Sequence, residues 1–254
     1  MNKSAKLAEL RHFLARYGLP PERAPITTGH PQADEVLGGG LRPGALHEVF
    51  ASGWSAGGFA ALLALMAAQG SFNGKGGPLF WIRSDYEAME YGALSPDGLL
   101  ALGGDPRHLI QVRTKNAADA LCAASDILAC SHVGAVLLEV EGMPKCLDLV
   151  ASRRLAFAAG ESGVTVLLLR NGAQAEPSAA LTRWQVASIP SHADDDDWGN
   201  PAFAAQLIRH RLGGVGNFLM KWNLQNVCFE TADIGAVVST PAGRPVYTQE
   251  RRAI

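Results

Sequence analysis

Short runs rich in apolar residues recur along the chain. They cover residues 45–50, 79–82, 109–112, 135–140 and 164–169. Runs of this length match β-strands, and a nearly continuous apolar run indicates a strand that is buried on both faces, as in a parallel sheet. The pattern therefore predicts five strands.

The segments between these strands carry the spacing of helices. Helices are predicted over residues 59–69, 117–129 and 152–160, each between two of the strands. A repeated strand–helix order favours a mostly parallel, twisted sheet with helices on both faces. The expected fold class is therefore α/β.

The N-terminal part has a different pattern. Residues 4–16 predict an amphipathic helix, with these side chains at helical spacing: Leu7, Leu10, Phe13 and Leu14. Residues 20–44 hold several prolines and are interpreted as an ordered linker without regular structure.

The C-terminal part predicts a closing hairpin over residues 218–239, followed by a segment without a periodic face. These patterns divide the chain into an N-terminal helix with a linker (1–27), a core domain (28–239) and an exposed C-terminal tail (240–254).

A loop of small residues joins the first predicted strand to the first predicted helix, the order found in nucleotide-binding α/β domains. In a phosphate loop, G-x-x-x-x-G-K-[ST], the Lys binds phosphate and the hydroxyl binds Mg²⁺. With Gly57 as the second glycine, these positions hold Gly58 and Phe59, and no Lys or Arg occurs in residues 48–69. We therefore expect no bound nucleotide or other cofactor at this degenerate loop, whose positions are Ser52, Gly53, Gly57, Gly58 and Phe59.

Composition narrows the function further. The chain has 254 residues, with 22 basic and 24 acidic side chains, a balance that does not indicate tight DNA binding by electrostatics alone. The cysteines lack C-x-x-C spacing, and the run Asp194–Asp197 lacks the glycine turn and distal Glu of an EF-hand, so no metal site is expected. No secretory signal or long apolar stretch occurs, so we expect a cytoplasmic protein without membrane contact.

Two sets of motifs resemble a known family. The lead-in to the first strand, with Thr28-Gly29, Asp34-Glu35, Leu37, Gly38-Gly39-Gly40-Leu41, Gly44 and Leu46-x-Glu48, resembles the entry to the core of RecA-type recombinases. The missing lysine, the run Pro177-Ser178-Ala179-Ala180-x-Thr182-Arg183-Trp184 and the segment from Phe203 to Trp222 are similar to the ImuA family, RecA-like proteins of bacterial damage-induced mutagenesis cassettes. The resemblance covers residues 28–225 and implies a RecA-like core.

The resemblance also implies positions for two acids. Asp85 matches the acid that positions the attacking water in RecA-like ATPases, and Glu139 matches the Walker B acid. Both are expected to be vestigial, because the loop lacks its lysine and hydroxyl. The alternative is an ATPase with an unorthodox phosphate site, its positive charge supplied by Lys75, by Arg83 or by a neighbouring protomer.

Candidate binding surfaces follow from the same resemblance. Weak, salt-sensitive contact with single-stranded DNA is expected from five basic side chains: Lys145, Arg153, Arg154, Arg170 and Arg183. In RecA-type proteins the N-terminal helix packs on a neighbouring protomer, although packing on its own domain is the alternative here. The candidate partner contacts are Leu7, Leu10, Phe13, Leu14, Phe203, Arg209, Arg211 and Trp222.

Taken together, the resemblance implies a non-catalytic adaptor of a mutasome in the SOS response. Its implied partners are an ImuB-type inactive Y-family polymerase, an error-prone replicative-type DNA polymerase and RecA, with homo-oligomers as a further candidate state. It would support translesion synthesis and associate with the nucleoid after DNA damage. A SulA-type inhibitor of cell division is a second alternative.

Overall fold

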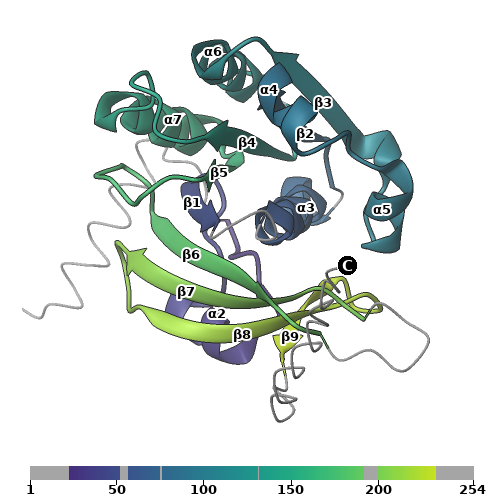
Figure 1. Cartoon of the computed structure of the whole chain (residues 1–254). Coiled ribbons are helices and arrows are strands. Elements are labelled where there is room, and N and C mark those ends of the chain that lie inside the picture. The colour runs from purple at the N-terminus through teal and green to yellow at the C-terminus, as the bar shows by residue number, and fades with distance from the viewer. Residues whose placement is uncertain (1–22, 52–56, 75, 131, 192–198, 233–254) are drawn as a thin grey trace, which may run out of the picture.

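The computed structural model describes residues 23–51, 57–74, 76–130, 132–191 and 199–232. Within them one sheet has the strand order β3-β2-β4-β5-β1-β6-β7-β8-β9 (Figure 1). The first six strands of this order pair in parallel, and the pairs from β6 to β9 are antiparallel. The strands are β1 (Leu46–Ala51), β2 (Leu79–Ser84), β3 (Leu109–Thr114), β4 (Ala135–Glu141), β5 (Thr165–Asn171), β6 (Thr182–Ile189), β7 (Ala202–His210), β8 (Gly216–Asn223) and β9 (Cys228–Thr231).

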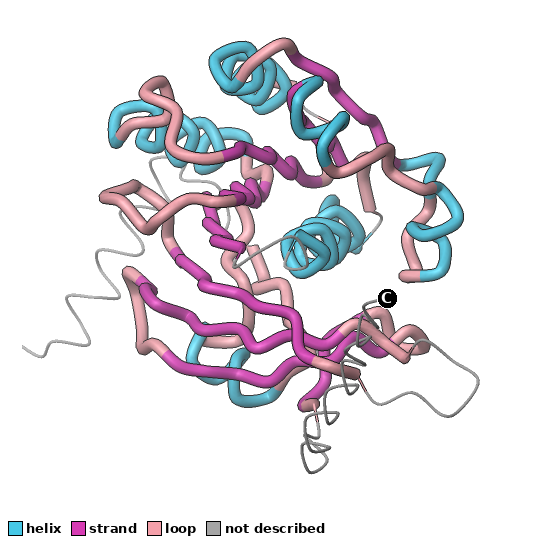
Figure 2. Tube along the Cα trace, viewed as in Figure 1, coloured by secondary structure: helices cyan, strands magenta, loops and turns pink. Residues whose placement is uncertain are grey.

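Helices cover both faces of the sheet (Figure 2). They are α2 (Pro31–Leu37), α3 (Gly57–Gly74), α4 (Asp85–Glu90), α5 (Pro96–Ala101), the 3-10 helix η2 (Pro106–His108), α6 (Ala117–Leu128) and α7 (Leu149–Ser162). The sheet curves around α3, whereas α6 and α7 pack on the opposite face (Figure 1). The α/β class and the mostly parallel sheet are thus confirmed, and the architecture is consistent with a RecA-like core.

Helix α3 is apolar on nearly all sides, which is typical of a helix buried on several sides. Its buried residues form one core with the inner face of the sheet and with α2. At its start, the Phe59 ring lies 5.8 Å from Trp184 of β6, 5.5 Å from Phe203 of β7 and 5.2 Å from Phe229 of β9, measured between centroids. A second core lies between the other face and helices α6 and α7.

The predicted linker over residues 20–44 is wrong in part, because residues 31–37 form α2. Pro31 stands at the first position, where a missing N–H costs nothing. The ring Nδ1 of His30 accepts the Ala33 N–H at 3.2 Å, and Gly38 ends the helix in the left-handed region at φ 76°. Proline in this segment starts a helix rather than preventing one.

The glycines and acids of the lead-in have structural roles. Asp34 accepts hydrogen bonds from the Thr28 N–H at 2.8 Å, the Thr28 hydroxyl at 2.7 Å and the Gly29 N–H at 3.1 Å. Gly40 has φ 133°, and a Cβ there would lie 2.2 Å from the carbonyl oxygen of Ile26. This motif therefore closes a turn against the chain segment before residue 28.

Strands β6 and β7 were missed as strands in the sequence analysis. Phe203, Ala205 and Leu207 of β7 alternate toward the α3 core, with the exposed Gln206 between them. This period of two was the signal that identifies a strand. The predicted closing hairpin is confirmed by the antiparallel pair of β8 and β9, and residues 233–239 of its predicted range lie outside the described residues.

Candidate functional site

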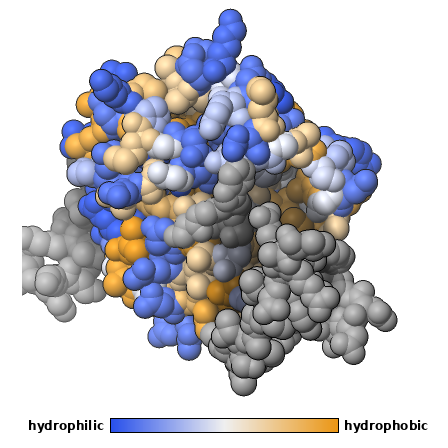
Figure 3. Space-filling model, viewed as in Figure 1, coloured by the Kyte–Doolittle hydropathy of each residue, from blue (hydrophilic) through white to orange (hydrophobic). Residues whose placement is uncertain are grey.

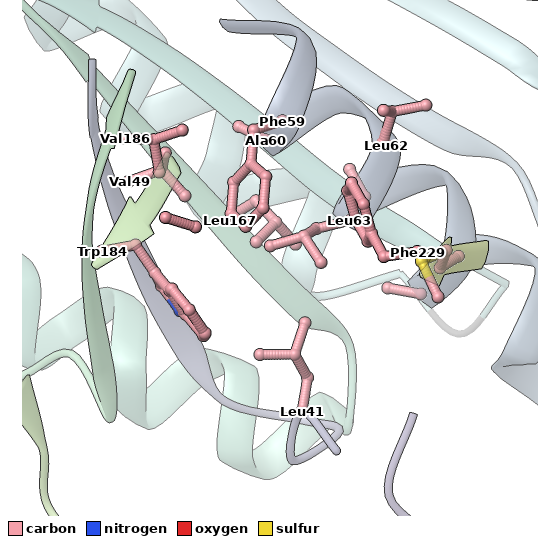
Figure 4. Close-up of a cluster of buried hydrophobic side chains, with 14 of the residues drawn as sticks. Leu41, Val49, Phe59, Ala60, Leu62, Leu63, Leu167, Trp184, Val186 and Phe229 are labelled. Carbon is pink, nitrogen blue, oxygen red and sulfur yellow. The ribbon is translucent and has the colours of Figure 1, made fainter. Parts of the chain in front are cut away.

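The degenerate phosphate loop joins the carboxyl end of β1 to α3, where α/β sheets carry their sites. Ser52 and Gly53 lie outside the described residues. Gly57 and Gly58 form the start of α3, and Phe59 is fully buried in the core around this helix (Figure 4). The position of the Mg²⁺-binding hydroxyl is thus occupied by a core aromatic ring.

Glu139 projects from β4 at the same edge of the sheet and is buried. Its Oε2 accepts the Trp81 indole N–H at 3.1 Å, and its Oε1 accepts the Asn171 amide N–H at 3.1 Å. Arg83 Nε lies 3.3 Å from Oε2 as an ion pair. Burial raises the pKa of Glu139, and the charge of Arg83 opposes that shift. The carboxylate is therefore held by protein groups on both oxygens.

Arg83 is also buried and already bonded. Its two terminal nitrogens donate to the carbonyl oxygens of Gly92 at 3.0 Å and Glu87 at 2.8 Å. A guanidinium in this position neutralises the carboxylate beside it. Lys75, the other candidate for phosphate charge, lies outside the described residues.

Asp85 lies in a different environment from Glu139. It is the first residue of α4 and is 58% exposed, and its Oδ1 pairs with the Arg113 guanidinium of the edge strand β3 at 2.8 Å. Asp85 and Glu139 thus engage different partners and do not share a site.

The two sets of family motifs meet in the core beneath the α7 face of the sheet. Glu48 of β1 and Arg183 of β6 form a buried ion pair with an Nε–Oε2 distance of 2.9 Å. The Ser178 hydroxyl donates to the same Glu48 oxygen at 2.8 Å, and the Ala179 N–H donates to the Ser152 hydroxyl of α7 at 3.1 Å. The segment before β6 is therefore fixed to β1 and α7.

A histidine from the lead-in adds a second buried link. His47 Nε2 lies 3.0 Å from the Arg42 carbonyl oxygen and must carry the proton. His47 Nδ1 therefore accepts the Thr182 hydroxyl at 2.7 Å, and that hydroxyl accepts the Trp184 indole N–H at 3.1 Å. Burial lowers the pKa of His47 to about 4.

The His47 pKa predicts a pH dependence of stability. The unfolded state binds this proton with a pKa near 6.5 and the folded state only near 4, so this contribution is complete above 6.5 and lost as pH falls through 4. The total contribution to the free energy of unfolding is about 3 kcal/mol.

Urea unfolding at several pH values should show a smaller decline in the free energy of unfolding for His47→Gln than for the parent chain. A residual decline is expected from His30 and His210, since burial lowers the pKa of both. Equal declines for the two proteins would contradict the assignment.

Two predicted DNA contacts are wrong. Arg170 and Arg183 are buried. Arg170 donates to the Gly142 carbonyl oxygen at 3.1 Å and lies over the Phe50 ring, and Arg183 is bonded to Glu48. Both guanidinium groups contact protein groups inside the domain. The other three candidates of that set are exposed: Lys145, Arg153 and Arg154.

Two predicted partner contacts are wrong for the same reason. Phe203 is a member of the α3 core, and Trp222 is fully buried with its indole N–H donating to the Leu102 carbonyl oxygen at 3.2 Å. Arg209 and Arg211 are exposed. The other four candidates lie outside the described residues: Leu7, Leu10, Phe13 and Leu14. The acidic run Asp194–Asp197 also lies outside them.

Neither a metal site nor a membrane-spanning helix is seen in the part of the chain that the structure describes. The described residues hold no group of three or more His, Cys, Asp or Glu side chains placed to bind a metal ion. Of the helices seen in this part of the chain, none is both long and apolar enough to cross a membrane.

Comparison with known proteins decides the family. No family profile matches the chain. Protein ImuA from two Caulobacter vibrioides strains, NA1000 and CB 15, is 32% identical over 213 residues, which cover 77% of this chain and 82% of the relative. The chain belongs to the ImuA family. Membership associates it with the damage-inducible mutagenesis cassettes of bacteria, as the sequence motifs predicted. The ImuA-like run from Pro177 to Trp184 is, in this structure, the strand entry that pairs with the lead-in motif.

Proposed function

We propose that this protein is a non-catalytic adaptor of an ImuA-type mutasome. The observation that carries the proposal is the filling of the nucleotide position. Phe59 takes the place of the Mg²⁺-binding hydroxyl inside the core, and Glu139, at the Walker B position, is neutralised by Arg83. Among the described residues, a nucleotide would find neither a free cation nor a free carboxylate at these positions, so the fold would serve as a surface for partners.

Family membership supports the identity of these partners. We propose that the protein contacts an ImuB-type inactive polymerase, an error-prone replicative-type polymerase and RecA during translesion synthesis. It would act in the cytoplasm and gather at the nucleoid after DNA damage. The exposed arginines Arg153, Arg209 and Arg211 supply cationic contact points for such partners.

Calorimetry tests the absence of a nucleotide switch. Mg–ATP titrated into the purified protein, with and without single-stranded DNA, is expected to give no saturable heat. A RecA-type ATPase titrated in parallel is the positive control. Saturable binding in the micromolar range would overturn the proposal and favour the ATPase alternative.

A genetic assay tests the adaptor role itself. In a host that lacks its chromosomal copy, the parent chain should restore the frequency of damage-induced mutation. Failure to restore it, with the protein present at normal level, would contradict a role in mutagenesis even if no nucleotide binds.

A further inference from the structure

A groove lies between α7 and the end of β7, away from the degenerate phosphate loop. Its volume is about 560 Å³, which is within the range of sites that bind small molecules or several side chains. Its walls are Arg153 and Phe157 of α7, Arg209 of β7 and Arg211 just beyond it. Its floor is the segment Pro177–Ala179.

The groove is positively charged. Three of its nine lining residues are arginines, and none is acidic. Asp148, the acid just before α7, accepts the Ala151 N–H at 2.7 Å as the helix cap and is not part of the lining. The Arg211 guanidinium is 3.4 Å from the Ala179 carbonyl oxygen, which positions it over the floor. Carboxylates are the side chains that such a cluster recognises most strongly.

The groove is also apolar in part. Phe157 is 71% exposed, and Leu149 and Ala156 line the groove beside it. An exposed phenyl group loses contact with water only when a partner covers it. Hydrophilic and hydrophobic patches are mixed over the visible face of the molecule (Figure 3). What characterises the groove is therefore that an exposed aromatic ring and three arginines line the same depression.

The floor is rigid because it is tied to the interior. Ser178 is bonded to the buried Glu48, and Ala179 to Ser152 of α7. Arg183, paired with Glu48, also donates to the carbonyl oxygen of Glu176 just before the floor. A preorganised floor lowers the entropy cost of binding. The family motif therefore shapes this groove from below.

We propose that this groove binds a short peptide segment that combines carboxylates with a large apolar side chain. The arginines pair with the carboxylates, and the apolar side chain packs on Phe157. Arginine and aromatic side chains are the usual anchors of protein interfaces. Single-stranded DNA is the competing class, but an aliphatic lining residue such as Leu149 gives nothing to a phosphate backbone.

The inference deepens the proposed function, since it gives the adaptor a partner surface. Its test needs neither nucleotide nor cells, so the two can fail separately. Saturable ATP binding would overturn the first and leave the second standing. If the peptide does not bind but damage-induced mutation is restored, the groove proposal falls and the adaptor proposal stands.

Fluorescence anisotropy provides the test. The probe is a fluorescein-labelled ten-residue peptide of aspartates with one central tryptophan, titrated with the full chain. Arg153→Ser and Phe157→Ala should each weaken binding by about tenfold or more. The matched control is Arg154→Ser, which removes the neighbouring exposed arginine outside the groove and should change binding by less than about twofold. All three side chains are exposed, so the variants should fold, which circular dichroism checks.

Other outcomes overturn the proposal. They are no binding by the parent chain, equal loss in Arg153→Ser and Arg154→Ser, or equal binding of a peptide with asparagine in place of aspartate. A labelled twenty-nucleotide oligothymidylate is titrated in parallel. If Arg153→Ser weakens oligonucleotide binding and leaves peptide binding unchanged, the groove is a nucleic-acid site instead.

Discussion

Replacing Glu139 with alanine is expected to lower the free energy of unfolding by about 3–5 kcal/mol, the usual cost of breaking a buried ion pair from one side. The substitution leaves the Arg83 guanidinium buried without its counter-charge. It also removes the acceptor of the Trp81 and Asn171 N–H groups. Urea unfolding followed by circular dichroism measures the change.

The control is the other acid of the implied catalytic pair. Asp85→Ala breaks an exposed pair with Arg113, and such pairs contribute at most about 1 kcal/mol. The double variant Glu139→Ala with Arg83→Ala should lose less than the sum of the two single losses, by at least about 1 kcal/mol. If Asp85→Ala proved as damaging as Glu139→Ala, or if the two losses at the ion pair were additive, Glu139 would not have the structural role described.

Phe59→Thr, which restores the consensus hydroxyl, is expected to destabilise the protein by about 3–5 kcal/mol. The ring is fully buried between α3 and the strands β6, β7 and β9. A threonine leaves a cavity in that core and buries a hydroxyl. Thermal and urea unfolding of the variant measure this loss.

The matched control changes the neighbouring consensus position. Gly58 is exposed, and a Cβ there would lie 3.6 Å from the Phe203 ring, an ordinary contact. Gly58→Lys should therefore alter stability by less than about 1 kcal/mol. A Phe59→Thr variant as stable as Gly58→Lys would show that the core tolerates a phosphate-loop residue. On the structure described, only the lysine can be restored without a large loss of stability.

The parallel half of the fold could be predicted from the sequence, because a strand buried on both faces needs apolar residues at nearly every position. Strands such as β4 and β5 are nearly continuous apolar runs. Helix α2 was not predicted, because proline interrupts most helices, whereas Pro31 stands at the first helical position, where proline is favoured. Strand β7 was not predicted because its basic end, which includes Arg209, resembles a charged surface segment. The alternation of buried and exposed positions that begins at Phe203 was the signal for the strand.

The candidate surfaces were harder to predict, because spacing does not tell a buried arginine from an exposed one. Arg183 and Arg209 face each other across β6 and β7 as register partners. One pairs with Glu48 in the interior and the other lines the groove. Arg183 is buried because it reaches the carboxylate of Glu48 on another strand, whereas Arg209 is exposed. A single sequence does not show which residues far apart in the chain come into contact.

The curvature of the sheet around α3 has a consequence for synthesis on the ribosome. The first turn of this helix packs on β9, where the Phe229 ring covers Phe59. Because Phe229 comes much later in the sequence, Phe59 leaves the ribosome long before the ring that covers it. Until then an apolar helix is without part of its cover, which is the state that chaperones bind and that aggregates. Because α3 is apolar on nearly all sides, the nascent chain depends on its last strands to cover this helix. A chain cut short before β9 would therefore be a substrate for proteolysis rather than a smaller working domain.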